Sequence, residues 1–66
     1  MDKQAAINAM RQGGYKVSHV LFDSSEWIAY CDKEYYIDEQ GHYLNIDEFW
    51  KNRQCKEWET GWSIIG

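Results

Sequence analysis

The chain contains no proline, only two cysteines and no long hydrophobic run among its 66 residues. Its longest uncharged hydrophobic-rich stretch, Val17–Phe22, is far too short to cross a bilayer. The first residues contain no apolar run behind a basic region, which argues against a signal peptide. In a reducing compartment, a pair such as Cys31 and Cys55 is more often two free thiols than a disulfide. These absences favour a cytoplasmic protein with unpaired cysteines.

Sequence motifs for metal binding and catalysis are also missing. His19, Cys31, His42 and Cys55 are separated by 12, 11 and 13 residues, without the close ligand pair of a zinc site. Gly13-Gly14 is not followed by the Gly-Lys-Ser/Thr of a phosphate-binding loop. A chain this short has little room for a nucleophile, its base and an oxyanion pocket. We therefore expect no enzyme activity, no metal site and no cofactor.

Aromatic residues are abundant instead: four Trp, five Tyr and two Phe. A 60-residue domain buries only about 60% of its unfolded surface, and each buried ring removes roughly 150–250 Å² from water. The rings are therefore first the means of folding and only then candidates for a binding surface. We expect a single domain over residues 1–66. The lack of disulfides and metals also favours a homo-oligomer, because small chains need additional stabilisation.

The residue pattern predicts an α+β fold that begins with a helix. Asp2 can cap this helix, Ala6, Ile7 and Met10 form its apolar stripe, and Gly13-Gly14 ends it. Alternating apolar residues and turn residues then predict an antiparallel meander of three or four strands. The strand candidates are Lys16–Phe22, Glu26–Cys31, Tyr35–Glu39 and His42–Leu44.

A short second helix is predicted at Asp47–Gln54, where Asn45 and Glu48 have capping-box spacing and Asp47 is an alternative cap. A polar connection, Cys55–Gly61, follows it, and Trp62–Ile65 is predicted to be a C-terminal strand.

Acidic residues are concentrated in the middle of the chain. Residues 23–48 contain eight carboxylates and one cation, Lys33, which gives this segment a charge of −7 in a chain whose net charge is −4. Such a segment is poorly suited to a phosphate backbone and well suited to a basic protein surface.

Two sets of residues are therefore candidates for binding. The partner-binding set combines the acidic residues with tyrosines of the meander: Asp23, Glu26, Tyr30, Asp32, Glu34, Tyr35, Tyr36, Asp38 and Glu39. An alternative ligand-binding set combines cations with tryptophans, which can grip a nucleotide by stacking and phosphate pairing: Arg11, Lys16, Trp50, Arg53, Trp58 and Trp62. For both sets, simple packing into the core is the competing interpretation.

Both ends of the chain resemble a known group of proteins. Ala5–Gly13 followed by Lys16-Val17, then an aromatic meander and a closing Gly61–Ile65, is similar to short proteins encoded by phages and prophages. This group includes the second Thoeris anti-defence family, which sequesters a cyclic ADP-ribose-type signal, and a related protein reported as an anti-CRISPR. The resemblance implies phage origin and a small α+β fold.

Three functions remain open from the sequence. The first is a non-enzymatic counter-defence protein that inhibits a host protein with a basic surface, in the manner of an anti-CRISPR. The second is a sponge for a cyclic nucleotide signal, and the third is an accessory phage protein with a structural role. The acidic middle segment favours the first. No direct contact with nucleic acid or membrane is expected.

Overall fold

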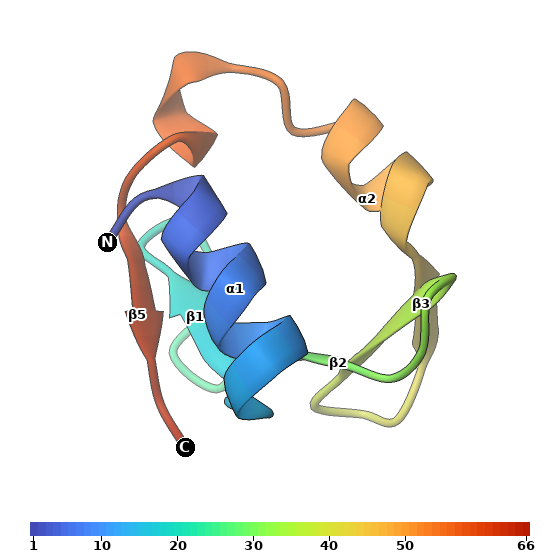
Figure 1. The fold of residues 1–66 in the computed structure, drawn as a ribbon. Coiled ribbons are helices and arrows are strands. Elements are labelled where there is room, and N and C mark those ends of the chain that lie inside the picture. Colours follow the sequence, from blue (N-terminus) through green and yellow to red (C-terminus); the bar gives the residue numbers. More distant parts are fainter.

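The computed structural model describes residues 1–66 and has an α+β fold (Figure 1). The elements in chain order are α1 (Lys3–Gly13), β1 (Val17–His19), β2 (Ile28–Tyr30), β3 (Tyr35–Asp38), β4 (Tyr43–Asn45), α2 (Ile46–Lys51), the 3-10 turn η1 (Lys56–Trp58) and β5 (Trp62–Ile64). The predicted order of helix, meander, short helix and final strand is confirmed.

The strands form a single antiparallel sheet in the order β4-β3-β2-β1-β5. β1 to β4 are the meander, and β5 returns to pair with β1, which places Trp62 opposite His19. Met1 lies beside β5: its amino group donates to the Trp62 carbonyl at 2.8 Å, and the Trp62 N–H donates to the Met1 carbonyl at 3.2 Å. Figure 1 shows the two termini on this side of the molecule.

Local hydrogen bonds explain where α1 begins and ends. The Asp2 carboxylate accepts from the Ala5 N–H at 2.8 Å, which satisfies one of the unpaired donors of the first turn. Gly14 has a φ of 66°, and its N–H bonds to the Ala9 carbonyl, as in a left-handed helix end. The predicted cap and the predicted glycine terminus are both confirmed.

α2 is shorter than predicted and begins one residue earlier. Its cap is as expected, because the Asn45 side chain accepts from the Glu48 N–H at 3.0 Å. The helix ends at Lys51 because the Arg53 N–H bonds to the Trp50 carbonyl, a tighter i to i−3 connection. The prediction of a plain polar connection over Cys55–Gly61 missed η1, which places the half-buried Trp58 against the core.

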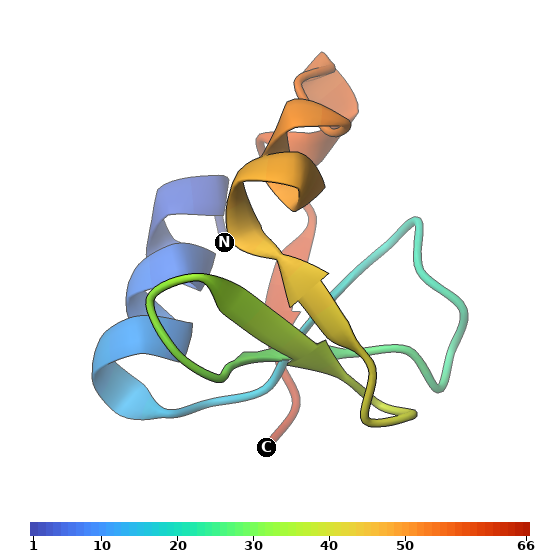
Figure 2. The same ribbon diagram turned by 90° about the vertical axis from the view of Figure 1, so that its right-hand side faces the viewer.

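Both helices pack on the same face of the sheet. Seven hydrophobic residues are buried between these layers: Ala6, Met10, Val17, Ile28, Tyr36, Phe49 and Trp62. The rings of Phe49 and Trp50 from α2 contact Tyr36 edge-on, at centroid distances of 5.6 and 6.3 Å. In Figure 2 the loop between β1 and β2 extends away from α1, on the far side of the strands. Because α1 and α2 share one face of the sheet, the opposite face of β3 and β4 carries no helix.

Candidate binding surface

Strand register divides the meander residues between the two faces of the sheet. Tyr36 pairs with Leu44 on the helix-covered face, whereas Ile37 pairs with Tyr43 on the open one. Successive residues of the predicted strand Tyr35–Glu39 point to opposite faces, which puts Tyr35 and Ile37 on one face and Tyr36 on the other, in agreement with this register.

Two tyrosines stand on the open face. The rings of Tyr35 and Tyr43 meet edge-on at a centroid distance of 6.0 Å, and their exposed fractions are 36% and 65%. Together with Cys31 and Asp32 they line a shallow pocket of about 400 Å³. We call Tyr35, Ile37, Tyr43, Cys31 and Asp32 the tyrosine face. Tyr43 was absent from the sequence-based set, and the signal that could have identified it was its alternation with the inward-facing Leu44.

Several of the candidate carboxylates also shape turns. Asp32 accepts from the backbone N–H groups of Glu34 and Tyr35, each at 2.9 Å. Asp38 accepts from those of Gln40 and His42 at 3.0 and 2.9 Å, and Glu26 accepts from that of Asp23 at 2.8 Å. These bonds hold Asp32, Asp38 and Glu26 in fixed positions, so part of the acidic pattern has a structural role.

Very few of the acidic side chains are neutralised by cations. The single contact of this kind joins His42 Nδ1 to Asp38 at 3.8 Å. Glu34, Asp23 and Asp32 are exposed. The side chain of Glu34 makes no hydrogen bond and no ion pair. Glu39 is partly exposed. The negative charge of the middle segment is therefore largely uncompensated within the chain.

Two tyrosines of the predicted partner-binding set lie on the helix-covered face of the sheet rather than on the open one. Tyr36 is only 1% exposed, and its hydroxyl accepts from Trp50 Nε1 at 2.9 Å, so its inclusion in that set is wrong. Burial raises the pKa of Tyr36, and the hydrogen bond from Trp50 and the charge of Arg11 partly oppose this effect. Tyr30 is half-buried on the same face, with the Arg11 guanidinium 5.9 Å from its ring centre.

The alternative ligand-binding set is split between the core and separate places on the surface. Trp62 is 2% exposed and donates from Nε1 to the Trp58 carbonyl at 2.8 Å, so it has no surface for a ligand. Arg53 lies between the rings of Phe49 and Trp58, 4.0 and 5.0 Å from their centres. Burial lowers the pKa of Arg53, and the carboxylate of Glu26 opposes this shift.

The other two cations of that set lie elsewhere. Lys16 Nζ lies 4.6 Å from the centre of the Trp27 ring, and Arg11 lies over Tyr30. The structure therefore does not gather Arg11, Lys16 and Arg53 around a single ligand. Trp50, however, shares a pocket with Arg11.

His19 has a structural role that the sequence did not indicate. It is buried at 4% exposure, and its Nε2 lies 3.0 and 2.7 Å from the carbonyls of Glu57 and Thr60. Its Nδ1 accepts from the Leu21 N–H at 3.0 Å, which fixes the proton on Nε2. His19 therefore connects the η1 segment to β1 by hydrogen bonds.

Cys31 and Cys55 are free and exposed. No group of three or more His, Cys, Asp or Glu side chains is arranged to hold a metal ion.

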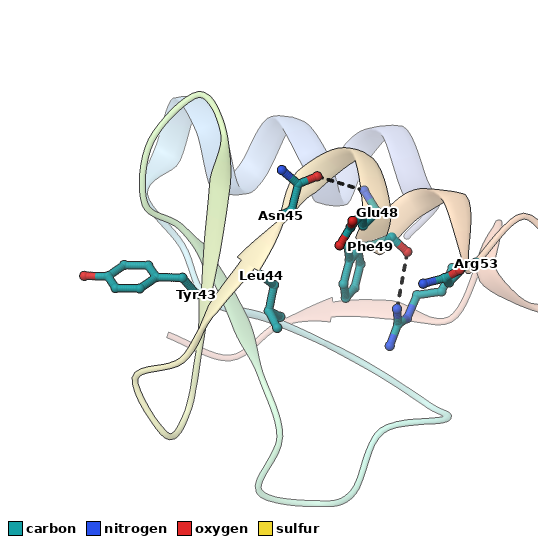
Figure 3. Close-up of a pocket in the computed structure, with 7 residues that line it drawn as sticks. Tyr43, Leu44, Asn45, Glu48, Phe49 and Arg53 are labelled. Carbon is teal, nitrogen blue, oxygen red and sulfur yellow. Dashed lines mark hydrogen bonds between the residues drawn. The ribbon is translucent and has the colours of Figure 1, made fainter.

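A groove of about 260 Å³ runs beside β4 and α2 (Figure 3). Phe49 and Leu44 form its floor, Asn45 and Glu48 flank it, and Arg53 donates to the Phe49 carbonyl at 3.3 Å at one end. In the same view the Tyr43 ring points away from α2.

A second pocket, of about 270 Å³, lies where α1, the β2–β3 turn and α2 meet. Its lining is mostly apolar and includes three exposed charged residues, Arg11, Lys33 and Asp47. Neither Lys33 nor Asp47 was a candidate from the sequence, because residues this far apart in the chain show no common spacing.

No family model matches the chain, and no curated protein or solved structure is similar enough to count as a match. None of the helices has both the length and the apolar character needed to span a membrane.

Proposed function

We propose that the chain is a small non-enzymatic inhibitor of the phage counter-defence type, which binds a host protein with a basic surface through its tyrosine face. The observation that carries this proposal is the exposed Tyr35–Tyr43 pair beside Asp32 on a sheet face that no helix covers. Exposed tyrosines are common anchors of protein interfaces, because they bury a large rigid area and retain a polar end.

Charge complementarity identifies the kind of partner. The tyrosine face belongs to a segment with a charge of −7, and Glu34 beside it is exposed and unpaired. Opposite charge on a partner accelerates encounter and fixes orientation. A typical interface buries about 800 Å² on each partner, which is under a fifth of this chain's 4471 Å² of surface. Two tyrosine rings provide less than this area, so in this proposal the exposed carboxylates of Asp32 and Glu34 also take part in the contact.

The nucleotide-sponge function has less support. Trp62 is buried, and Arg11, Lys16 and Arg53 contact different aromatic rings. An accessory structural role is the outcome that remains if no partner binds the tyrosine face.

Site-specific photo-crosslinking tests the proposal. A photoreactive phenylalanine analogue replaces Tyr43 in one variant and the similarly exposed Leu21 in a control variant, and each is irradiated in a bacterial lysate. A host protein captured at position 43 but not at position 21 is then purified, and its affinity is measured directly. We expect Tyr43→Ala to weaken binding about 30-fold, as for an interface hot spot of about 2 kcal/mol, and Leu21→Ala to have no effect.

Salt tests the electrostatic part of the same proposal. The Debye length falls from about 10 Å at 0.1 M to about 3 Å at 1 M ionic strength. Glu34→Gln and added salt should therefore each weaken the binding, and salt should have a smaller effect on the Gln variant. An affinity that is unchanged by Tyr43→Ala and by 0.5 M salt would overturn the proposal.

A further inference from the structure

The pocket between α1, the β2–β3 turn and α2 has features that the tyrosine face lacks. It lies on the helix-covered side of the sheet, and Ile7, Tyr30, Ile46 and Trp50 form its apolar walls. Its residues come from separate parts of the chain, so the pocket exists only in the folded protein. A ligand held there would contact both helices and the sheet at once.

Hydrogen-bond donors converge on this pocket. The Tyr36 hydroxyl uses its oxygen to accept from Trp50 Nε1 at 2.9 Å, and its own proton is donated to no other protein group. Tyr36 is 1% exposed and lines the pocket, so this proton is free for a group that enters it. The Arg11 guanidinium lies over Tyr30 at 5.9 Å and also lines the pocket, and Lys33 adds a third donor.

Local charge points to an anionic ligand. The chain as a whole has a net charge of −4, yet Arg11 and Lys33 outnumber Asp47 around this pocket. The charge of Arg11 also acts on the Tyr36 hydroxyl, because it lowers the pKa that burial raises. A planar guanidinium suits a carboxylate, which accepts two parallel N–H bonds from it.

The volume limits the size of the ligand. About 270 Å³ exceeds the roughly 150 Å³ cavity that holds benzene. It is below the usual range of about 300–1,000 Å³ for pockets that hold drug-sized molecules. One flat ring with a carboxylate fits these limits, with its ring against Tyr30 and Trp50.

We propose that this pocket binds a small aromatic carboxylate, whose anionic group accepts from Arg11, Lys33 and the Tyr36 hydroxyl while its ring lies against the apolar walls. The site is separate from the tyrosine face and does not depend on the function proposed above.

Nuclear magnetic resonance of the ¹⁵N-labelled protein tests this proposal, with the Trp50 indole N–H as a reporter inside the pocket. The probes are benzoate and indole-3-acetate, with neutral benzamide and ring-free acetate as controls. We expect saturable shifts of the Trp50 signal with the two aromatic carboxylates. Their dissociation constants should be on the order of 1 mM or tighter, as expected for fragments of roughly ten non-hydrogen atoms. Benzamide and acetate should bind at least tenfold more weakly.

Variants separate specific binding from a general response. Arg11→Gln and Lys33→Gln change exposed residues and leave the core intact, and each should weaken benzoate binding about tenfold. Lys56→Gln, which removes an exposed charge away from the pocket, should leave it unchanged. Tyr43→Ala should also leave it unchanged, which separates this site from the tyrosine face. Non-saturable shifts, equal shifts with benzamide, or full affinity in both pocket variants would overturn the proposal.

Discussion

Replacing Tyr36 by phenylalanine removes one hydroxyl from the core and leaves the ring in place. The Trp50 N–H, which donates to this hydroxyl at 2.9 Å, then has no acceptor. A lost hydrogen bond of this kind costs about 1 kcal/mol, and more when the remaining donor is fully buried. A chain of this size has a total stability of about 3–10 kcal/mol. A loss of about 1 kcal/mol should lower the melting temperature by about 4–8 °C.

The same substitution should change how stability depends on alkaline pH. In the unfolded chain a tyrosine releases its proton near pH 10, whereas burial raises the pKa of Tyr36 in the folded protein. Above pH 10 the unfolded state therefore binds fewer protons than the folded state, and the wild-type protein loses stability as pH rises toward the folded pKa. The phenylalanine side chain of the variant does not titrate, so the stability difference between wild type and variant should shrink from pH 7 to pH 11.

Urea denaturation followed by tryptophan fluorescence measures both effects. Tyr43→Phe is the matched control, because its hydroxyl is on the exposed face and makes no hydrogen bond in the structure. It should change the free energy of unfolding by less than about 0.5 kcal/mol. The reasoning is refuted if Tyr36→Phe is as stable as wild type at pH 7, or if the stability difference stays constant up to pH 11.

Three further substitutions test local features, each by thermal denaturation followed by circular dichroism. Asp2→Ala removes the helix cap and should cost about 1 kcal/mol; an unchanged melting temperature would show that the cap contributes nothing. Gly61→Ala, at a φ of 90°, places a Cβ 3.0 Å from Val20 Cγ2 and 3.1 Å from His19 Nε2, and should cost about 2–5 kcal/mol. Gly14→Ala is its control, because it shares a positive φ but has no neighbour within 4 Å, and should cost about 1–2 kcal/mol; equal losses would contradict the steric explanation. His19→Phe keeps an aromatic ring but leaves a backbone N–H and two carbonyls without their partner, and should cost about 1–3 kcal/mol; a stable variant would show that the ring alone suffices.

Features governed by neighbouring residues could be predicted well. The Asp2 cap, the Gly14 helix end and the Asn45 cap each depend on hydrogen bonds within a few residues, and all three are present. Strand alternation also placed Tyr35 and Tyr36 on opposite faces. α2 was predicted too long, because its end depends on a tight turn at Arg53 that no residue pattern marked.

The candidate sites were harder to predict, because exposure depends on residues far apart in the chain. Nothing in the local sequence around Tyr36 and Trp62 distinguishes them from the exposed aromatic residues Tyr35 and Tyr43, yet both lie in the core. Lys33 lies near Arg11 and Asp47 only because two helices meet the β2–β3 turn.

The order of residues alone specifies the helix ends at the capping residues, the alternation of the strands and the acidic character of the middle segment. These are consequences of short-range hydrogen bonding, side-chain periodicity and composition. Which aromatic rings are buried depends on the tertiary fold, because β5 pairs with β1 and both helices cover the same face of the sheet. That packing buries Tyr36 and Trp62 and leaves Tyr35 and Tyr43 in solvent. It also assembles a positively charged pocket within a negatively charged protein, since Arg11 and Lys33 meet there from separate elements.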